Sequence, residues 1–158
     1  MYKEIDGDLI KLAKQKHFDI IAHGCNCFCT MGSGIAKTVK EEFPNAYLAD
    51  LRTVNGDINK LGNYSEAKIE NLQLTILNCY TQYGYNTSEK PFDYEAFTLC
   101  MRKINQKFST YKIGLPLIGS YRAGGDWNMI KEIIKKELTR MDVTIVKFNE
   151  NEQKNKTA

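Results

Sequence analysis

The residues best suited to chemistry lie in two short stretches rich in glycine. The first is HGCNCFCTMGSGIA, residues 23–36, and the second is IGSYRAGG, residues 118–125. Glycine has no side chain, so backbone N–H groups in such a stretch can approach a ligand closely. A helix that begins after the stretch adds further N–H groups that have no intrahelical partner. The pattern therefore predicts a site for an anionic group such as a phosphate.

The first stretch also has a simpler interpretation, which stays open at this point. Gly32-Ser33-Gly34 is short enough to be only a tight connection between a strand and a helix, because brief glycine patterns occur often. Two observations favour a ligand site. Asn26 follows a predicted strand, where open α/β sheets bind ligands. The second glycine stretch has a similar design.

Each glycine stretch is expected to connect a buried strand to a helix. The apolar run 19–22 predicts a strand before the first stretch, and helical spacing of apolar residues predicts a helix from about Ser33 to Glu42. That helix should end before Pro44, because the residue before a proline disfavours helix. The second stretch follows a predicted strand at 112–115 and precedes a helix at 127–139, which Asp126 is placed to cap.

The remaining pattern alternates strands with helices. Strands are expected at 2–5, 63–69, 72–80 and 143–148, helical segments at 45–52 and 94–108, and a polar surface loop at 81–91. This order predicts an α/β fold, with a mixed, largely parallel sheet of about six strands between layers of helices. Both glycine loops should then lie at one edge of the sheet, where they could hold an elongated ligand between them.

Composition limits the class of protein. The chain has 158 residues, of which 42% are hydrophobic and 26% charged, and its net charge is +3. We expect one domain over residues 1–149 and a polar, disordered tail at 150–158. No apolar run approaches the ~20 residues of a membrane span, and no signal peptide is evident, so we expect a cytoplasmic protein. The weak, scattered basic charge gives no strong nucleic-acid signal.

Several motifs together resemble the macro domain, an ADP-ribose-binding α/β/α module. They are Gly7-Asp8-Leu9, His23-Gly24-Cys25-Asn26-Cys27 with Met31-Gly32-Ser33-Gly34-Ile35-Ala36, Leu115-Pro116-Leu117-Ile118-Gly119, and Ala123-Gly124-Gly125-Asp126-Trp127. The resemblance covers nearly the whole chain. The branch that it resembles most is that of the yeast-type ADP-ribose-1''-phosphate phosphatases and their bacterial and phage relatives, which share a His-x-Cys-Asn-Cys start.

The resemblance implies a set of ligand-binding residues. They are Asp8, Leu9, Ala22, Asn26, Thr30, Met31, Gly32, Ser33, Gly34, Ile35, Ala36, Leu117, Ile118, Gly119, Ser120, Tyr121, Arg122, Ala123, Phe148 and Asn149. By this resemblance Asp8 accepts from the adenine amino group, and Asn26 faces the distal ribose. Phe148 and Asn149 fall where the family lines the adenine and the proximal ribose. Residues 31–36 surround the distal ribose and one phosphate, and residues 118–123 hold the diphosphate.

Some of these residues have alternatives that the sequence does not settle. Asp8 has the type and place of a turn or helix-cap residue, and Phe148 fits plain core packing. Tyr121 and Arg122 depart from many relatives, which have glycine and leucine there. They are either ligand contacts, with Arg122 on a phosphate, or solvated residues at a loop tip.

The candidate catalytic residues are His23, Asn26 and Asp126. His23 has the chemistry of a general acid or base, and its alternative is a strand-end histidine bonded to backbone. Asp126 could orient water, although helix capping is the simpler role. We expect neither a metal nor another cofactor, and we interpret the cysteines at 25, 27 and 29 as small buried side chains rather than zinc ligands.

A lysine-based glycohydrolase mechanism, found in related enzymes, does not fit this sequence. Those enzymes carry a lysine late in a central strand, where this chain has Asn78-Cys79-Tyr80-Thr81. They also carry an aspartate at the position that aligns with Ala123.

Three functions remain. The first is a phosphatase that converts ADP-ribose-1''-phosphate to ADP-ribose. The second is a non-catalytic ADP-ribose reader. The third is a hydrolase that removes ADP-ribose from modified macromolecules, which would be partners of the protein.

Overall fold

The computed structural model describes residues 1–120 and 122–148. Tyr121, Asn149 and the tail expected to be disordered lie outside the described residues. Among the described helices, none is both long and apolar enough to cross a membrane.

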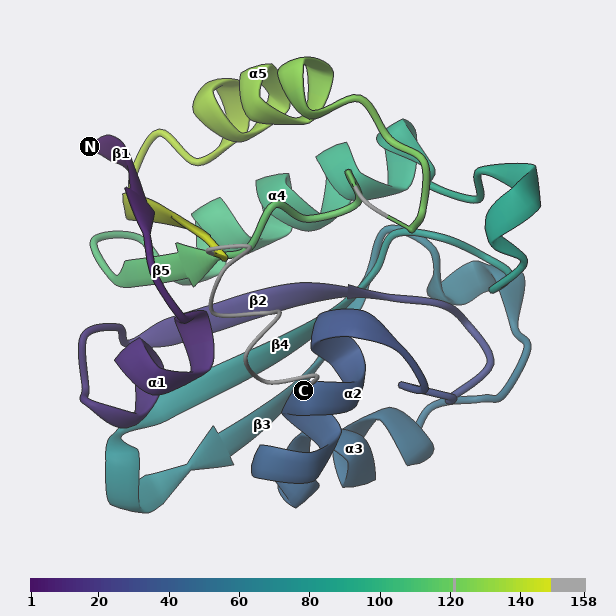
Figure 1. Cartoon of the computed structure of the whole chain (residues 1–158), viewed down its shortest axis with the longest axis horizontal. Coiled ribbons are helices and arrows are strands. Elements are labelled where there is room, and N and C mark those ends of the chain that lie inside the picture. Colours follow the sequence, from purple (N-terminus) through teal and green to yellow (C-terminus); the bar gives the residue numbers. More distant parts are fainter. Residues whose placement is uncertain (121, 149–158) are drawn as a thin grey trace.

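A single six-stranded sheet organises the described chain (Figure 1). Its strands are β1 (Tyr2–Asp6), β2 (Ile20–Cys25), β3 (Tyr64–Ile69), β4 (Leu74–Tyr80), β5 (Lys112–Leu115) and β6 (Asp142–Lys147). In space they follow the order β1-β6-β5-β2-β4-β3. All neighbouring strands run parallel except β3, the outermost strand, which is antiparallel to β4. The prediction of a mixed, largely parallel sheet is confirmed.

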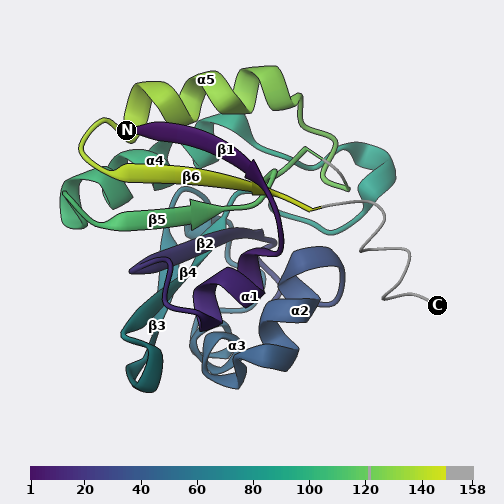
Figure 2. The same ribbon diagram turned by 60° about the vertical axis from the view of Figure 1, so that its left-hand side comes forward.

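Helices cover both faces of this sheet. They are α1 (Leu9–Lys14), α2 (Gly34–Glu42), α3 (Pro44–Leu51), α4 (Tyr94–Lys107) and α5 (Trp127–Glu137), with 3-10 turns η1 (Ile58–Lys60), η2 (Glu70–Leu72) and η3 (Thr87–Glu89). Helices α4 and α5 lie on one face, and α1, α2 and α3 lie on the other (Figures 1 and 2). The result is a three-layer α/β/α arrangement.

The core is divided by the sheet into two halves. On β2, Ile20 and Ala22 pack with the buried residues of α4 and α5, whereas Ile21 and Cys25 pack with those of α1, α2 and α3. Side chains of a strand alternate between faces, so one nearly continuous apolar run supplies both halves of the core.

Two sequence expectations need adjustment. The strand expected at 19–22 continues to Cys25, so His23 lies inside β2 and not at its end. The strands expected at 63–69 and 72–80 are present as β3 and β4, which form a hairpin with η2 as its turn. The segment expected as a surface loop at 81–91 contains η3 and a bridge between Gln82 and Phe92.

Candidate functional site

Five parallel strands end at the same edge of the sheet, and their following segments gather there. These segments are Asp8 after β1, Phe148 after β6, and three longer ones that we name loop 1 (residues 26–33, after β2), loop 2 (residues 116–126, after β5) and the support segment (residues 81–93, after β4). The prediction that both glycine loops share one edge is confirmed. Such an edge is where ligands bind in open α/β sheets.

The first half of loop 1 is held firmly by hydrogen bonds. The Asn26 side chain accepts from the Phe28 amide at 2.8 Å and donates to the Thr30 hydroxyl at 2.7 Å. The Cys27 amide donates to the carbonyl of Tyr83 at 2.9 Å. Asn26 therefore shapes the loop itself. Its amide nitrogen has a second hydrogen and its oxygen a second lone pair, so contact with a ribose remains chemically possible.

The second half of loop 1 presents backbone amides at the start of α2. None of the amides of residues 31–34 donates to another residue in the described part of the chain. Ser33 is extended and its side chain does not cap the helix. Gly34 has a φ of 58°, and an added Cβ there would meet nothing within 4 Å. The arrangement leaves an uncapped, electropositive helix start with open space in front of it.

The predicted residues around this helix start divide into exposed and buried ones. Gly32, Ser33 and Gly34 are exposed, Met31 is buried beside Val39, and Ile35 and Ala36 are half-buried on α2. Ala22 is fully buried in the centre of β2. Of these residues, the structure therefore brings chiefly the Gly32-Ser33-Gly34 segment to the surface.

Loop 2 is a compact turn built on Phe92. The amide and hydroxyl of Ser120 both donate to the Leu117 carbonyl, at 3.3 and 2.7 Å. A Cβ on Gly119 would lie 2.2 Å from the Phe92 ring, and the Gly125 amide closes the turn by donating to the Gly119 carbonyl at 2.8 Å. Gly119 is thus required by packing as well as by its φ of 74°.

The flanks of loop 2 differ in exposure. Ile118 and Ala123 are buried, and the Ile118 side chain packs over Gly24 at the end of β2. Arg122 is exposed. The predicted contact at Tyr121 lies outside the described residues.

The support segment connects both loops and was not among the predicted site residues. Its Tyr83 carbonyl holds loop 1, and its Phe92 amide donates to the Ala123 carbonyl of loop 2 at 3.1 Å. The ring of Tyr83 lies 4.9 Å from that of Phe28, edge to face. The feature of the sequence that could indicate this role is the number of aromatic residues in a stretch that is otherwise polar.

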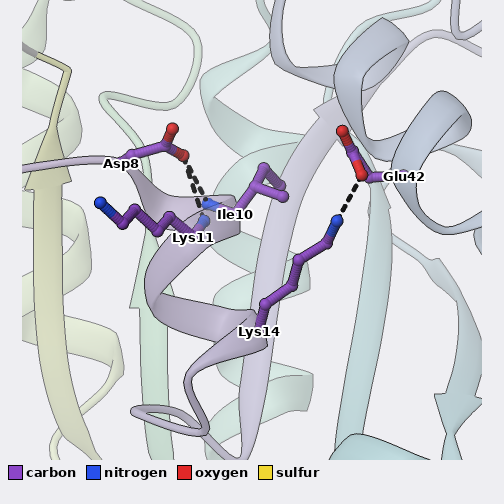
Figure 3. A network of polar contacts seen from close by, with 5 residues as sticks. All are labelled: Asp8, Ile10, Lys11, Lys14 and Glu42. Atoms are coloured by element: carbon purple, nitrogen blue, oxygen red, sulfur yellow. Dashed lines mark hydrogen bonds and ion pairs between the residues drawn. The ribbon is translucent and has the colours of Figure 1, made fainter.

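Asp8 caps α1 and lines a hollow of about 370 Å³ between α1 and α2. Its Oδ1 accepts from the amides of Ile10 at 3.1 Å and Lys11 at 3.2 Å, while Lys14 pairs with Glu42 across the same hollow (Figure 3). The cap alternative for Asp8 is therefore confirmed, and its contact with adenine stays a prediction. Leu9 beside it is buried.

Phe148 follows β6 and is 39% exposed, so the alternative of plain core packing is wrong. The predicted contact at Asn149 lies outside the described residues.

His23 is enclosed in the α3 side of the sheet. Its Nε2 lies 2.7 Å from Oδ1 of Asn78, whose Nδ2 donates to the carbonyl of Ala46 and to Ser65. Because that oxygen must accept, Nε2 carries the proton and donates. Burial lowers the pKa of His23 to about 4, and the hydrogen bond opposes that fall only in part. The His23 ring makes its hydrogen bond with a side chain and not with the backbone. The structure does not bring this ring to the exposed amides of residues 31–34.

Asp126 caps α5, so the simpler interpretation is confirmed. Its side chain accepts from the Asn128 amide at 2.9 Å, and its own amide donates to the Tyr94 hydroxyl at 2.8 Å.

The five cysteines are free and buried, which agrees with the interpretation of those at 25, 27 and 29 as small buried side chains. Burial raises the pKa of Cys27 to about 11 and that of Cys25 well above its ordinary range. Among the described residues, no three His, Cys, Asp or Glu side chains come together as metal ligands would.

No family model matches the chain. It is 37% identical over 152 residues to an uncharacterised 17.5 kDa protein of Enterobacteria phage T4, encoded in the tk–vs intergenic region, and the match covers 91% of this chain and 94% of the phage protein. The chain belongs to the family of this phage protein.

Comparison with solved structures shows the fold of this chain. The macrodomain of Thermus aquaticus DarG superposes with a TM-score of 0.72 at 19% identity, over 94% of this chain and 98% of that one. Thermosipho africanus DarTG in complex with ADP-ribose gives 0.72 at 16% identity, over 92% and 40%. A Trypanosoma brucei macrodomain in complex with ADP gives 0.70 at 16%, over 97% and 66%. The fold is that of a macrodomain, and the resemblance seen in the sequence is confirmed at that level.

Proposed function

We propose that this macrodomain binds ADP-ribose at the sheet edge, between loop 1 and loop 2. The observation that carries the proposal is the uncapped start of α2, where the amides of residues 31–34 have no partner in the described chain and Gly34 faces open space. Backbone N–H groups at a helix start suit the oxygens of a diphosphate. The similar folds of DarTG with ADP-ribose and of the trypanosome macrodomain with ADP support the same ligand class.

The ends of the ligand follow from the family roles of single residues. In this proposal Asp8 and Phe148 receive the adenosine, at the ends of β1 and β6, and Asn26 receives the distal ribose at the end of β2. Because β6 and β5 separate β1 from β2 in the sheet, the ligand must extend across several strands. An elongated dinucleotide-like molecule meets that requirement.

Calorimetric titration with ADP-ribose, ADP and AMP tests the binding proposal. We expect one ADP-ribose per chain and progressively weaker binding of ADP and AMP, because AMP leaves the start of α2 and Asn26 without contacts. Equal affinities for AMP and ADP-ribose would remove the role of loop 1. No binding of ADP-ribose would overturn the proposal.

We further propose that bound ADP-ribose-1''-phosphate is hydrolysed slowly. Water attacks the terminal phosphorus, the bond from phosphorus to the 1'' oxygen breaks, and that oxygen takes a proton, which leaves ADP-ribose and inorganic phosphate. Amides at the start of α2 would stabilise the charge that develops on the phosphate, and Asn26 would hold the distal ribose. The exposed amides are the observation that favours this reaction.

His23 and Asp126 enter this reaction proposal as residues to be tested. His23 is buried against Asn78, so proton transfer by its ring requires a rearrangement around β2, and Asp126 already caps α5. Phosphate release should therefore be measured in EDTA for the wild type and for Asn26→Ala, His23→Ala and Asp126→Ala. We expect Asn26→Ala to lose the most activity. Activity that EDTA abolishes would contradict the metal-free scheme.

The same assay separates the alternatives. Binding of ADP-ribose without phosphate release would leave the reader function. Release of ADP-ribose from a modified protein or nucleic acid, measured on separate substrates, would instead identify a hydrolase acting on macromolecules.

A further inference from the structure

Behind loop 1 lies a buried ammonium group that the proposed function does not use. Lys60 ends the 3-10 turn η1 and is only 8% exposed. Its Nζ donates to the Cys27 carbonyl at 3.0 Å and to the Cys29 sulfur at 3.5 Å, and it lies 4.7 Å from the centre of the Tyr80 ring. No carboxylate of a described residue pairs with it.

This ammonium is therefore solvated chiefly by loop 1. A buried charge is costly unless polar groups surround it, and two of the three partners of Lys60 belong to loop 1. The dependence runs in both directions: the loop shields the charge, and the charge fixes the carbonyl of Cys27 and the side chain of Cys29 on either side of Phe28.

A second buried group completes the arrangement. Asp50 is 1% exposed, and its carboxylate accepts from the Tyr80 hydroxyl at 2.7 Å. Its backbone carbonyl accepts from the Cys29 sulfur at 3.3 Å and from Thr53 at 2.6 Å. Burial raises the pKa of Asp50, whereas the Tyr80 hydrogen bond and the charge of Lys60 act in the opposite direction. Asp50 and Lys60 thus both hold the Cys29 side chain of loop 1.

Loop 1 needs such a hold because its backbone is unfavourable by itself. Cys29 and Met31 have φ values of 55° and 41°, in the left-handed region that residues with side chains seldom adopt. Residues in that region persist when the surrounding contacts over-determine them. The exposed amides that follow Met31 keep their direction only if this turn is kept.

We propose that Lys60 is a positioning residue, which holds loop 1 in the conformation that binds the distal half of ADP-ribose. The inference rests on the proposed function. Lys60 does not touch the ligand. It acts through Cys27 and Cys29, and its effect should therefore appear in ligands that reach loop 1 and not in ligands that end before it.

The test compares Lys60→Met with Lys68→Met, a matched control at an exposed lysine on β3. Methionine keeps the apolar length of lysine and removes the charge and the donors. We expect Lys60→Met to bind ADP-ribose at least about tenfold more weakly, the scale of a lost hydrogen bond from a charged group. AMP should bind all three proteins within about twofold, because AMP makes no contact with loop 1 in this proposal.

Amide hydrogen exchange in the ligand-free proteins provides a second, independent measurement. We expect faster exchange at residues 27–34 in Lys60→Met than in wild type, with unchanged exchange in β5 and β6. If Lys60→Met does not fold, Lys60→Arg is measured in the same way, since it keeps the charge and alters the reach.

The outcomes separate this inference from the proposed function. If the wild type does not bind ADP-ribose, the proposed function fails. Amide hydrogen exchange alone then tests whether Lys60 holds loop 1. If the wild type binds and Lys60→Met binds equally well with unchanged exchange, the inference is overturned. An equal loss of ADP-ribose and AMP affinity would also overturn it, because that result indicates general damage rather than positioning of loop 1.

Discussion

At the scale of single residues, the two glycine loops owe their glycines to different causes. Gly34 faces open space, whereas Gly119 lies against the Phe92 ring. The sequence alone gives the same expectation for both glycines, because each lies in a segment that connects a strand to a helix. Packing against Phe92 accounts for a glycine at position 119 without any ligand, and no such packing accounts for Gly34. The ligand contact of Gly119 stays a prediction.

Substitution of both glycines by leucine should separate these causes. Gly34→Leu should lower the free energy of unfolding by only about 1–2 kcal/mol, the cost of a side chain in the left-handed region, and abolish ADP-ribose binding. Gly119→Leu should fail to fold or lose far more stability, because the new Cβ overlaps the Phe92 ring. Thermal melts and calorimetry measure the two effects.

Gly34→Ala is the matched control for Gly34→Leu, because it carries the same backbone strain with little bulk. If alanine and leucine weaken ADP-ribose binding equally, the open space before Gly34 is not the path of the ligand.

The buried imidazole of His23 predicts a pH dependence of stability. Its pKa is about 4 in the folded protein and 6.5 in the unfolded chain. As the pH falls below 6.5, the unfolded chain takes up a proton that the folded protein does not, so stability decreases until about pH 4. The loss approaches about 3 kcal/mol over that interval.

Urea unfolding of wild type and His23→Gln between pH 7 and pH 4 measures this effect. Glutamine can still donate to Asn78 but does not titrate, so the variant should lose this part of the slope. His17→Gln, at an exposed histidine, is the control and should keep it. Identical slopes in all three proteins would contradict the assignment.

Residue types alone indicated several of these roles and left others open. The caps at Asp8 and Asp126 were predicted as alternatives from residue type and position, because capping is a local interaction. The contacts of His23 and Lys60 are made with residues far along the chain, at Asn78 and Cys27. No local pattern reports such contacts.

At the scale of elements, the support segment decides how the two loops are held. It bonds to loop 1 through the Tyr83 carbonyl and to loop 2 through the Phe92 amide and ring. Strands and helices were predictable because their apolar residues repeat with a fixed period. The support segment has no period, and its role depends on backbone bonds and ring contacts, so its sequence reads as a surface loop.

Truncation of Phe92 tests this role. Phe92→Ala should lower the free energy of unfolding by about 3–5 kcal/mol, the usual cost of removing a buried phenylalanine ring. It should also weaken ADP-ribose binding in the protein that remains folded, because loop 2 loses the surface on which it turns. Phe92→Leu, which keeps more of the buried volume, should show a smaller loss of both. Full ADP-ribose affinity in folded Phe92→Ala would contradict the proposed role of the support segment.

At the scale of the whole molecule, the two halves of the core share one sheet. Alternating residues of β2 enter both halves, so neither half can separate while the sheet persists. The class of fold was predictable from the alternation of strands and helices. The strand order was not, because it depends on which strands pair across long separations, as β1 does with β6.

The shared sheet predicts a single unfolding transition. Trp127, the one tryptophan in the sequence, lies on α5 and packs against the half of the core under α4 and α5. Its fluorescence should therefore follow the same urea curve as far-ultraviolet circular dichroism, which reports all the helices. Separate midpoints for the two signals would indicate that the halves unfold independently.

The pairing of β1 with β6 also has a consequence for synthesis on the ribosome. Tyr2 lies opposite Val143, and β6 fills the place between β1 and β5. A growing chain therefore carries its first strand without a neighbour until residues 142–147 have been added. Such distant pairing is the kind that slows folding. Until β6 has been synthesised, the sheet lacks the strand that lies between β1 and β5. Adenosine is expected to bind on this side of the sheet.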